Sequence, residues 1–387
     1  MFVRHALPGE RVLVRVTEGT ADSRYWRADA IDVLDPSPHR RVPPCPFAGP
    51  GRCGGCDWQH APAVVGRQLK AAVVAEQLRR LAGLTWQGEV ESVLGDSGDG
   101  LGWRTRVTFA VTPDGRAGLR RHRSHDIEPI TDCLIAHPAI REIDVPGRRW
   151  PDAGSVEVVV SSTGERQVVV TSADPERPAE VPPLGPDVSV VVDGMRVRGR
   201  MAVREQAAGR SWRVTGGGFW QVHPGATAVL VDAVLAGLEP QQGESALDLY
   251  SGVGLFAGAI GALVGRTGSV VAVESDRRAV ADARRNLHDL PQVRLVSGRV
   301  DRHVPEGPVD LVVLDPPRSG TGAAVARKIT ATGARAVVYV ACDPAALGRD
   351  LATFAASGYH PELIRAFDLF PMTHHVECVA VLRAATR

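Results

Sequence analysis

The pattern of hydrophobic and polar positions divides the 387-residue chain into three stretches. Residues 1–44 contain short runs in which apolar and polar residues alternate, as in Arg11–Val16, which is typical of strands with one buried face. Residues 45–215 contain further strand-like runs and one stretch, 61–83, with apolar residues at helical spacing. From residue 216 to 387, short apolar runs alternate with helical segments. This order predicts a small β domain, a central α+β domain and an α/β domain built on a mainly parallel sheet.

The apolar runs of the C-terminal stretch predict its strands one by one. They lie at Ala246–Leu249, Val270–Val273, Val293–Val296, Val309–Leu314, Ala336–Ala341, Tyr359–Leu369 and Val376–Leu382. Because helical segments separate the first five runs, these strands should be parallel and form a doubly wound, Rossmann-like sheet. The last two runs predict a closing β-hairpin. Ligands of such a sheet bind beyond the carboxyl ends of its strands, so we expect the chemistry there.

A turn of small residues follows the first of these strands. Gly252 and Gly254 allow the backbone to approach a ligand, and Glu274, at the end of the next strand, is placed to accept hydrogen bonds from ribose hydroxyls. The turn does not fit the G-x-G-x-x-G pattern that binds a dinucleotide. Asp248-Tyr-Ser-Gly-x-Gly instead resembles the S-adenosylmethionine (SAM) loop of class I methyltransferases. An ordinary βαβ packing unit is the alternative interpretation.

Composition and charge indicate the cellular compartment and the kinds of partner to expect. The formal net charge of +1 gives no overall attraction to polyanions. The chain shows no opening signal peptide and no apolar run of membrane-spanning length, so we expect a soluble, cytoplasmic monomer without a membrane partner. Six cysteines in a reducing compartment indicate metal binding or catalysis rather than disulfides.

Four of the cysteines have the spacing of metal ligands: Cys45, Cys53, Cys56 and Cys133. The first three lie within twelve residues, separated by glycines and prolines that let a loop fold around an ion. The fourth is the only other cysteine before the C-terminal third of the chain, and it completes the four thiolates of a [4Fe-4S] cluster. Zinc is the alternative, with His60 or His137 as a substitute ligand.

Two segments of the chain are locally basic. Residues 103–123 contain six arginines and one acid, Asp114, and residues 195–213 contain six arginines and one acid, Glu205. On a nearly neutral chain, such segments indicate a groove for phosphates. Solvated strand faces in an arginine-rich protein are the alternative.

Two of the predicted strand ends carry reactive side chains. The fourth strand leads into Asp315-Pro-Pro-Arg318, which resembles the D/N-P-P-Y loop of amino-methyltransferases, except that Arg318 replaces the aromatic residue that stacks on a base. The fifth strand leads into Cys342, followed by Asp343 as helix N-cap and Pro344 as first helical residue. Because a helix N-terminus favours thiolate, Cys342 is expected to be a nucleophile that activates a pyrimidine carbon. A small buried cysteine is the alternative.

The closing hairpin carries a candidate general base. Glu377 enters the last strand beside apolar residues, and a carboxylate buried there would have a raised pKa, suited to removing a proton from carbon near neutral pH. His374 and His375 are competing candidates for this role. A surface glutamate at a strand start is the alternative.

The start of the chain has a resemblance of its own. The segment FVRHALPGERVLVRV, residues 2–16, resembles the middle of a TRAM domain, an OB-like RNA-binding barrel found in several RNA-modifying enzymes. A complete barrel needs further strands before Met1, so we expect the native start to lie upstream. An unrelated β-hairpin is the alternative.

The motifs together resemble those of the RNA uridine-C5 methyltransferase family, the rRNA and tRNA 5-methyluridine synthases. After the four cysteines, the shared motifs run in order FWQVHP, DLYSGVG, DPPRSG, YVACDPAALGRDL and FPMTHHVE, and they cover nearly the whole chain. The resemblance implies Cys342 as nucleophile and Glu377 as base. For SAM binding it implies four residues: Gln221, Tyr250, Glu274 and Asp315. Three positions depart from residues found in relatives: His223, Leu255 and Arg299.

The reaction implied by this resemblance is methylation of carbon 5 of a uridine in rRNA or tRNA. Cys342 would add to carbon 6 of the uracil, and Glu377 would remove the proton from carbon 5 after methyl transfer. The uracil must be unpaired or flipped out, with Phe219 or Trp220 as stacking partner. Two other classes of protein remain open: a nicotinamide-linked iron–sulfur oxidoreductase and a catalytically silent RNA-binding relative.

Overall fold

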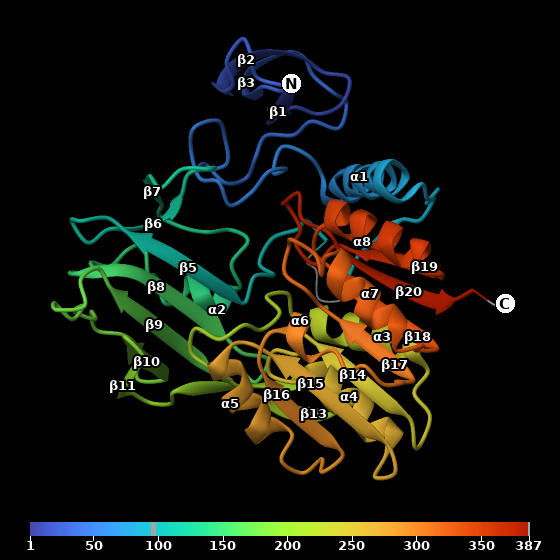
Figure 1. Ribbon diagram of the computed structural model, residues 1–387. Helices are drawn as coiled ribbons and strands as arrows, with labels where there is room; N and C mark the ends of the chain where they lie inside the picture. Colours follow the sequence, from blue (N-terminus) through green and yellow to red (C-terminus); the bar gives the residue numbers. More distant parts are fainter. Residues whose placement is uncertain (94–97, 386–387) are drawn as a thin grey trace.

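The computed structural model describes residues 1–93 and 98–385 and arranges them in three larger sheets and one two-stranded sheet (Figure 1). The N-terminal sheet has the strand order β1-β3-β2, with β1 (Phe2–Arg4), β2 (Arg11–Glu18) and β3 (Arg27–Asp35). It lies at the top of the view in Figure 1, above the other two larger sheets. The predicted small β unit is thus present, whereas a complete OB-like TRAM barrel stays a prediction.

The central sheet has seven strands in the order β11-β10-β9-β8-β5-β6-β7. Their bounds are β5 (Arg106–Val111), β6 (Ala117–Arg120), β7 (Ile127–Pro129), β8 (Ala153–Val160), β9 (Arg166–Ser172), β10 (Val188–Val192) and β11 (Met195–Arg198). Neighbouring strands are antiparallel except for β9 and β10, which are parallel. One short helix, α2 (Pro138–Arg141), packs on this sheet, and Trp150 is fully buried in its core.

The C-terminal sheet has eight strands in the order β16-β15-β14-β17-β18-β20-β19-β4. Its strands are β4 (Val90–Glu91), β14 (Ser245–Leu249), β15 (Ser269–Glu274), β16 (Val293–Ser297), β17 (Leu311–Leu314), β18 (Ala336–Ala341), β19 (Tyr359–Phe367) and β20 (Glu377–Ala384). Strands β14 to β18 are parallel, whereas β20 is antiparallel to both β18 and β19. The predicted doubly wound sheet with its closing hairpin is therefore confirmed.

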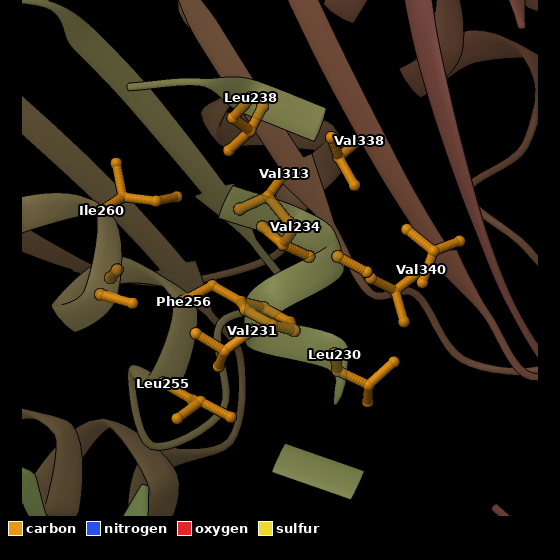
Figure 2. Packing of buried hydrophobic residues seen from close by; sticks show 14 of the residues in the cluster. Leu230, Val231, Val234, Leu238, Leu255, Phe256, Ile260, Val313, Val338 and Val340 are labelled. Carbon is orange, nitrogen blue, oxygen red and sulfur yellow. The ribbon is translucent and has the colours of Figure 1, made fainter. Parts of the chain in front are cut away.

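Helices cover both faces of this sheet. They are α3 (Ala226–Leu238), α4 (Leu255–Val264), α5 (Arg277–Asn286), α6 (Val300–His303), α7 (Ala323–Ala331) and α8 (Pro344–Ala356). Successive residues of a strand point to opposite faces. Val313 and Val338 accordingly pack against α3 and α4, as Figure 2 shows, while Val312 and Val337 pack on the other side with α7 and α8. Because both faces are buried, these strands are apolar throughout, which is why the sequence revealed them.

Two elements that precede the central sheet in sequence pack with the C-terminal sheet. Helix α1 (Ala63–Ala82) ends at Gly83, whose φ of 66° is the expected left-handed stop. It lies against α8 (Figure 1), where a Cβ on Gly348 would come within 3.0 Å of Leu81. Strand β4 extends the sheet beside β19. In the described ranges, no helix has both the length and the apolar character needed to cross a bilayer.

A β-hairpin of β12 (Ala202–Ala207) and β13 (Arg210–Thr215) also joins the C-terminal part. The indole of Trp212 is fully buried in the same core as α3 and α4. A Cβ on Gly258 of α4 would come within 2.6 Å of this indole, so the glycine allows the close approach.

Helix α1 does more than pack, because it carries a buried ion pair. The Nζ atom of Lys70 donates to the Asp368 carboxylate at 2.5 Å and to the carbonyl of Phe370 at 2.9 Å. Both side chains are almost completely buried, and burial is the main reason that the pKa of Lys70 is lowered. The helical spacing of apolar residues in 61–83 predicted the helix but gave no sign of the role of its one lysine. Lys70 fixes the chain directly after β19.

We expect Lys70→Ala to lower the free energy of unfolding by about 3–5 kcal/mol, because it leaves the Asp368 carboxylate buried without its partner. Urea denaturation measures this change. Lys328→Ala is the matched control, since Lys328 is exposed and should change stability by less than about 1 kcal/mol. Equal losses in the two variants would contradict the assignment, and Lys70→Met combined with Asp368→Leu should recover much of the loss.

Candidate active site

The carboxyl ends of the central parallel strands bring the predicted site residues to one edge of the sheet. Tyr250 follows β14, Glu274 ends β15, Asp315 follows β17 and Cys342 follows β18. Strand β20 runs in the opposite direction, so its first residue, Glu377, lies at the same edge. Ala341 pairs with Cys378, and the next pair along the two strands would be Cys342 with Glu377. The two predicted catalytic residues are therefore cross-strand neighbours.

The loop between β14 and α4 is held by Glu274. One oxygen of this carboxylate accepts a hydrogen bond from the N–H of Gly252 at 2.9 Å, and the other accepts one from the N–H of Asp276 at 2.7 Å. Gly252 has open space where a side chain would be, so the loop can approach a ligand. Gly254 begins α4 in the left-handed region, with φ 94°. Tyr250 is also left-handed, at φ 66°, a conformation that is uncommon for a bulky residue and often found at functional sites.

Asp248 lies fully buried beneath this loop. One of its oxygens accepts from the N–H of Ala257 at 2.7 Å, and its Oδ1 atom has no hydrogen-bond partner among the described residues. Burial raises the pKa of Asp248 to about 7, with smaller contributions from the charges of Asp315 and Glu274. The carboxyl group therefore anchors the first turn of α4 from below.

A hydrogen-bond network that the sequence interpretation missed joins the two ligand-facing loops. The Tyr250 hydroxyl lies 3.1 Å from the Thr321 hydroxyl, and the N–H of Thr321 donates to Asp350 at 2.7 Å. The Tyr339 hydroxyl donates to the same carboxylate at 2.8 Å. Asp350 belongs to the YVACDPAALGRDL motif, one to two helical turns beyond the N-cap of α8. This position was the feature of the sequence from which its role in the network could have been predicted.

Cys342 lies half-buried at the start of α8. Asp343 caps this helix through a 2.7 Å hydrogen bond from the N–H of Ala346, and Pro344 is its first residue, as predicted. Burial, followed by the negative charges of Glu377 and Asp315, raises the pKa of the Cys342 thiol to about 11, although Arg318 opposes this. Burial beside two acids therefore raises the pKa of the thiol, whereas the helix terminus was expected to favour the thiolate.

Glu377 is buried, with 3% of its surface exposed. Burial, together with the charge of Asp315, raises the pKa of Glu377 well above its usual range. Burial also raises the pKa of Asp315 to about 7. The predicted buried carboxylate with a raised pKa is therefore present, and it shares its surroundings with a second acid and with Arg318.

The two candidate histidines have partners of their own. His374 donates from its backbone N–H to Asp57 at 3.0 Å, and its Nδ1 atom lies 2.6 Å from the same carboxylate. The Nε2 atom of His375 lies 3.2 Å from Nη2 of Arg318. Burial, with the charges of His374 and Arg318, lowers the pKa of His375 to about 3, which keeps its ring neutral.

Gln221 occupies a different place from the other predicted SAM residues. It lines a cavity of about 450 Å³ together with Trp220, His223 and Glu205. Tyr250, Glu274 and Asp315 do not line this cavity. Phe219 has 68% of its surface exposed and is therefore accessible for stacking, whereas Trp220 is buried.

The four cysteines predicted to bind metal line one cavity of about 360 Å³. The N–H of Gly55 donates to the Sγ atom of Cys53 at 3.4 Å, and Nε2 of Gln59 donates to that of Cys56 at 3.2 Å. Such N–H donors suit thiolates, so the donor set fits a metal cluster. Within residues 1–93 and 98–385, however, no three Cys, His, Asp or Glu side chains are close enough to hold one ion. The cluster therefore stays a prediction.

The histidines considered as zinc ligands do not line this cavity. His60 lies with His5 beside a second cavity, and the Nδ1 atom of His137 accepts from the N–H of Ala139 at the start of α2. Neither histidine therefore lies at the cysteine cavity in this structure, and zinc with one of them as a ligand stays a prediction.

The second basic segment is compensated by acids from distant parts of the chain. Most of its arginines form ion pairs: Arg200 and Arg204 with Glu165, Arg210 with Asp289, and Arg213 with Asp282. Contrary to the prediction, residues 195–213 are therefore not an uncompensated basic surface. In the first segment, the side chains of Arg104 and Arg106 donate to backbone carbonyls.

Comparisons with known proteins indicate the family of the chain. The family described as tRNA (Uracil-5-)-methyltransferase matches residues 301–385, and the methyltransferase small domain matches residues 224–338. A protein of Streptomyces avermitilis named "Uncharacterized RNA methyltransferase" is 52% identical over 100% of this chain and 93% of its own. The 23S rRNA (uracil(1939)-C(5))-methyltransferase RlmD of Chromohalobacter salexigens is 31% identical over 100% of this chain and 85% of its own.

A solved structure has the same fold along its whole length. The Pyrococcus abyssi tRNA (uracil-54, C5)-methyltransferase, in complex with S-adenosyl-L-homocysteine, superimposes with a TM-score of 0.71 and 24% identity. The match covers 98% of this chain and 95% of that one. The fold is thus that of a class I methyltransferase with its additional N-terminal parts. On these relationships, the chain belongs to the RNA uracil-C5 methyltransferase family, and it is an RNA methyltransferase.

Proposed function

We propose that this protein methylates carbon 5 of a uridine in rRNA or tRNA, with SAM as methyl donor. The observation that carries the proposal is that Cys342 and Glu377 each lie one residue beyond the Ala341–Cys378 pair of β18 and β20, beside the glycine loop of β14. A nucleophile and a base are both needed at carbons 6 and 5 of one pyrimidine ring, so their side chains must lie close together. The relative that acts on uracil in 23S rRNA supports the substrate class.

The residues of the site supply the steps that the protein itself must perform. The thiolate of Cys342 forms a bond to carbon 6 of the uracil, which makes carbon 5 nucleophilic. SAM, when bound, would supply the methyl group to that carbon and leave as S-adenosyl-L-homocysteine. Glu377 then accepts the proton from carbon 5, and the sulfur–carbon bond breaks, which restores the uracil double bond and the free cysteine. Arg318 lies close enough to lower the pKa of both Cys342 and Glu377, so it favours their ionised forms.

We assign SAM binding to the loops that Glu274 and Tyr250 organise, with Asp315 beside them. The free space beside Gly252 and the hydrogen-bonded Glu274 support this assignment. Gln221 is proposed as the fourth contact, on the strength of its motif. Exposed Phe219 is suited to stacking on an unpaired base. A catalytically silent relative would not need Cys342 and Glu377 side by side, and a nicotinamide-linked oxidoreductase would need neither.

We further propose that the cysteine cavity holds a [4Fe-4S] cluster, with Cys45, Cys53, Cys56 and Cys133 as ligands. Protein purified without oxygen should be brown and contain roughly four iron atoms per chain. Cys133→Ala should lose most of the iron, whereas Cys342→Ala, outside the cavity, should keep it. Elemental analysis and the visible spectrum measure both. Stoichiometric zinc, or no metal at all, would contradict the cluster.

Two substitutions test the chemistry. Cys342→Ala should bind SAM normally but lose methylation by more than about a thousandfold, together with any denaturation-resistant protein–RNA complex. Glu377→Gln should instead accumulate that complex, because the carbon 5 proton can no longer be removed. Transfer of tritium from labelled SAM to RNA and to SDS-denatured protein measures both outcomes. Cys378→Ala, the neighbouring buried thiol, should keep activity, and full activity of Cys342→Ala would refute the nucleophile.

The raised pKa of Cys342 predicts how the reactivity of its thiol changes with pH. A thiol with a pKa of about 11 becomes more ionised as pH rises, so alkylation of Cys342 by iodoacetamide should increase roughly tenfold per unit from pH 7 to 10. Glu377→Gln removes a neighbouring negative charge and should lower this pKa, which makes alkylation severalfold faster at pH 8. Site-resolved mass spectrometry measures the rates. Glu362→Gln, on the exposed part of β19, is the control; identical profiles in all three proteins would be evidence against the assigned neighbours.

A further inference from the structure

The segment between β19 and β20, residues 368–376, carries the chain from an outer strand to Glu377. Its first part is held by Lys70, through Asp368 and the carbonyl of Phe370. Its last part is held by Asp57, which directly follows Cys56 in the cysteine loop. Both contacts come from one short stretch at the start of the chain. The segment that leads to the proposed base is therefore fixed from outside its own hairpin.

Asp57 contacts this segment with its backbone and its side chain. Its N–H donates to the carbonyl of Met372 at 2.8 Å, and the N–H of Trp58 donates to the same carbonyl at 3.1 Å. One carboxylate oxygen of Asp57 accepts from the backbone N–H of His374 and from its ring. The other oxygen accepts from Nη2 of Arg4, on β1, at 3.0 Å. Three parts of the chain therefore meet at one carboxylate.

The turn that Asp57 holds has an unusual backbone. Met372 has a φ of 64°, in the left-handed region that residues with side chains seldom adopt. Such conformations persist where the surroundings fix them, and they concentrate at functional sites. Two N–H groups on one carbonyl, and a carboxylate on the residue after next, are surroundings of this kind. Without these contacts, the left-handed backbone conformation of the turn is less stable.

The turn determines where the next residues lie. After His374 comes His375, whose ring contacts Arg318, and Glu377 follows two residues later, opposite Cys342. A general base works only within hydrogen-bond reach of the proton that it removes. A shift of about 1 Å in such a group can slow a reaction by about a hundredfold.

We propose that Asp57 is a positioning residue for Glu377, which it places by holding the turn at Met372 and His374. This inference rests on the proposed function, because it assumes that Cys342 forms the adduct and that Glu377 resolves it. Asp57 does not touch the uracil. Its loss should therefore slow the second step, proton removal, more than the first step, formation of the adduct.

Asp57→Ala keeps the backbone contacts to Met372 and removes the carboxylate. We expect its turnover to fall roughly tenfold or more, with the KM for RNA changed by less than about twofold, while the fraction of protein in the adduct rises as in Glu377→Gln. His374→Ala removes the other partner of the contact, and its side chain is 58% exposed, so the variant should fold. It should shift the ratio of adduct to turnover in the same direction, and the double variant should add little to either. The RNA is total RNA from a strain that lacks the gene, and tritium on SDS-denatured protein reports the adduct.

Asp132→Ala is the matched control. Asp132 also adjoins a cysteine, Cys133, and forms an ion pair with Arg141, but among the residues that the structure describes it makes no hydrogen bond or ion pair with 368–376. Its ratio of adduct to turnover should match the wild type. If Asp57→Ala and His374→Ala lower adduct and turnover in parallel, or change neither, the inference is overturned. If Glu377→Gln itself forms no adduct, the proposed function fails first, and the inference fails with it.

Discussion

The reversed direction of one strand is the constraint on which the site depends. If β20 ran parallel to its neighbours, its first residue would lie at the amino end of the sheet, a full strand length from Cys342. Because β20 is inserted antiparallel between β18 and β19, its start meets the end of β18, and Glu377 lies opposite the cysteine. The same reversal obliges residues 368–376 to return across the sheet edge. That connection has few partners within its own hairpin, and the stretch from Asp57 to Lys70 supplies them.

Burial and mutual repulsion make negative charge unfavourable at this edge of the sheet. Two carboxyl groups and one thiol lie together. Burial raises the pKa of all three, and carboxylate charge raises the pKa of Cys342 and Glu377 further. Arg318 is the cation that opposes this effect on Cys342 and Glu377. A negative charge on one of these groups therefore makes a second one less favourable. In the proposed reaction, a bound sulfonium adds positive charge to the same space, which favours the thiolate when the donor is present.

The sheet was predictable because strands buried on both faces are apolar throughout, as Ala336–Ala341 is. The edge where the site lies followed from the general geometry of parallel sheets. The helix cap at Asp343 and Pro344 depends only on residues adjacent in sequence, so it could be predicted from the sequence. The ion pairs of Arg200 and Arg213 were not predictable, because their acidic partners lie far away in sequence. The raised pKa of Cys342 was not predictable either, because it depends first on burial and then on Glu377 and Asp315, which only the fold brings to the thiol.

The contact between α1 and α8 joins a segment that is synthesised early to one that is synthesised near the end of translation. A ribosome makes α1 early, but its partner helix and strand β19, beside β4, emerge last. At ordinary rates of synthesis the delay is on the order of tens of seconds. During that time the apolar side of α1, with Val74 and Leu78, has no sheet to cover. The apolar face of this helix must therefore stay exposed to solvent, or be bound by a chaperone, until translation is nearly complete.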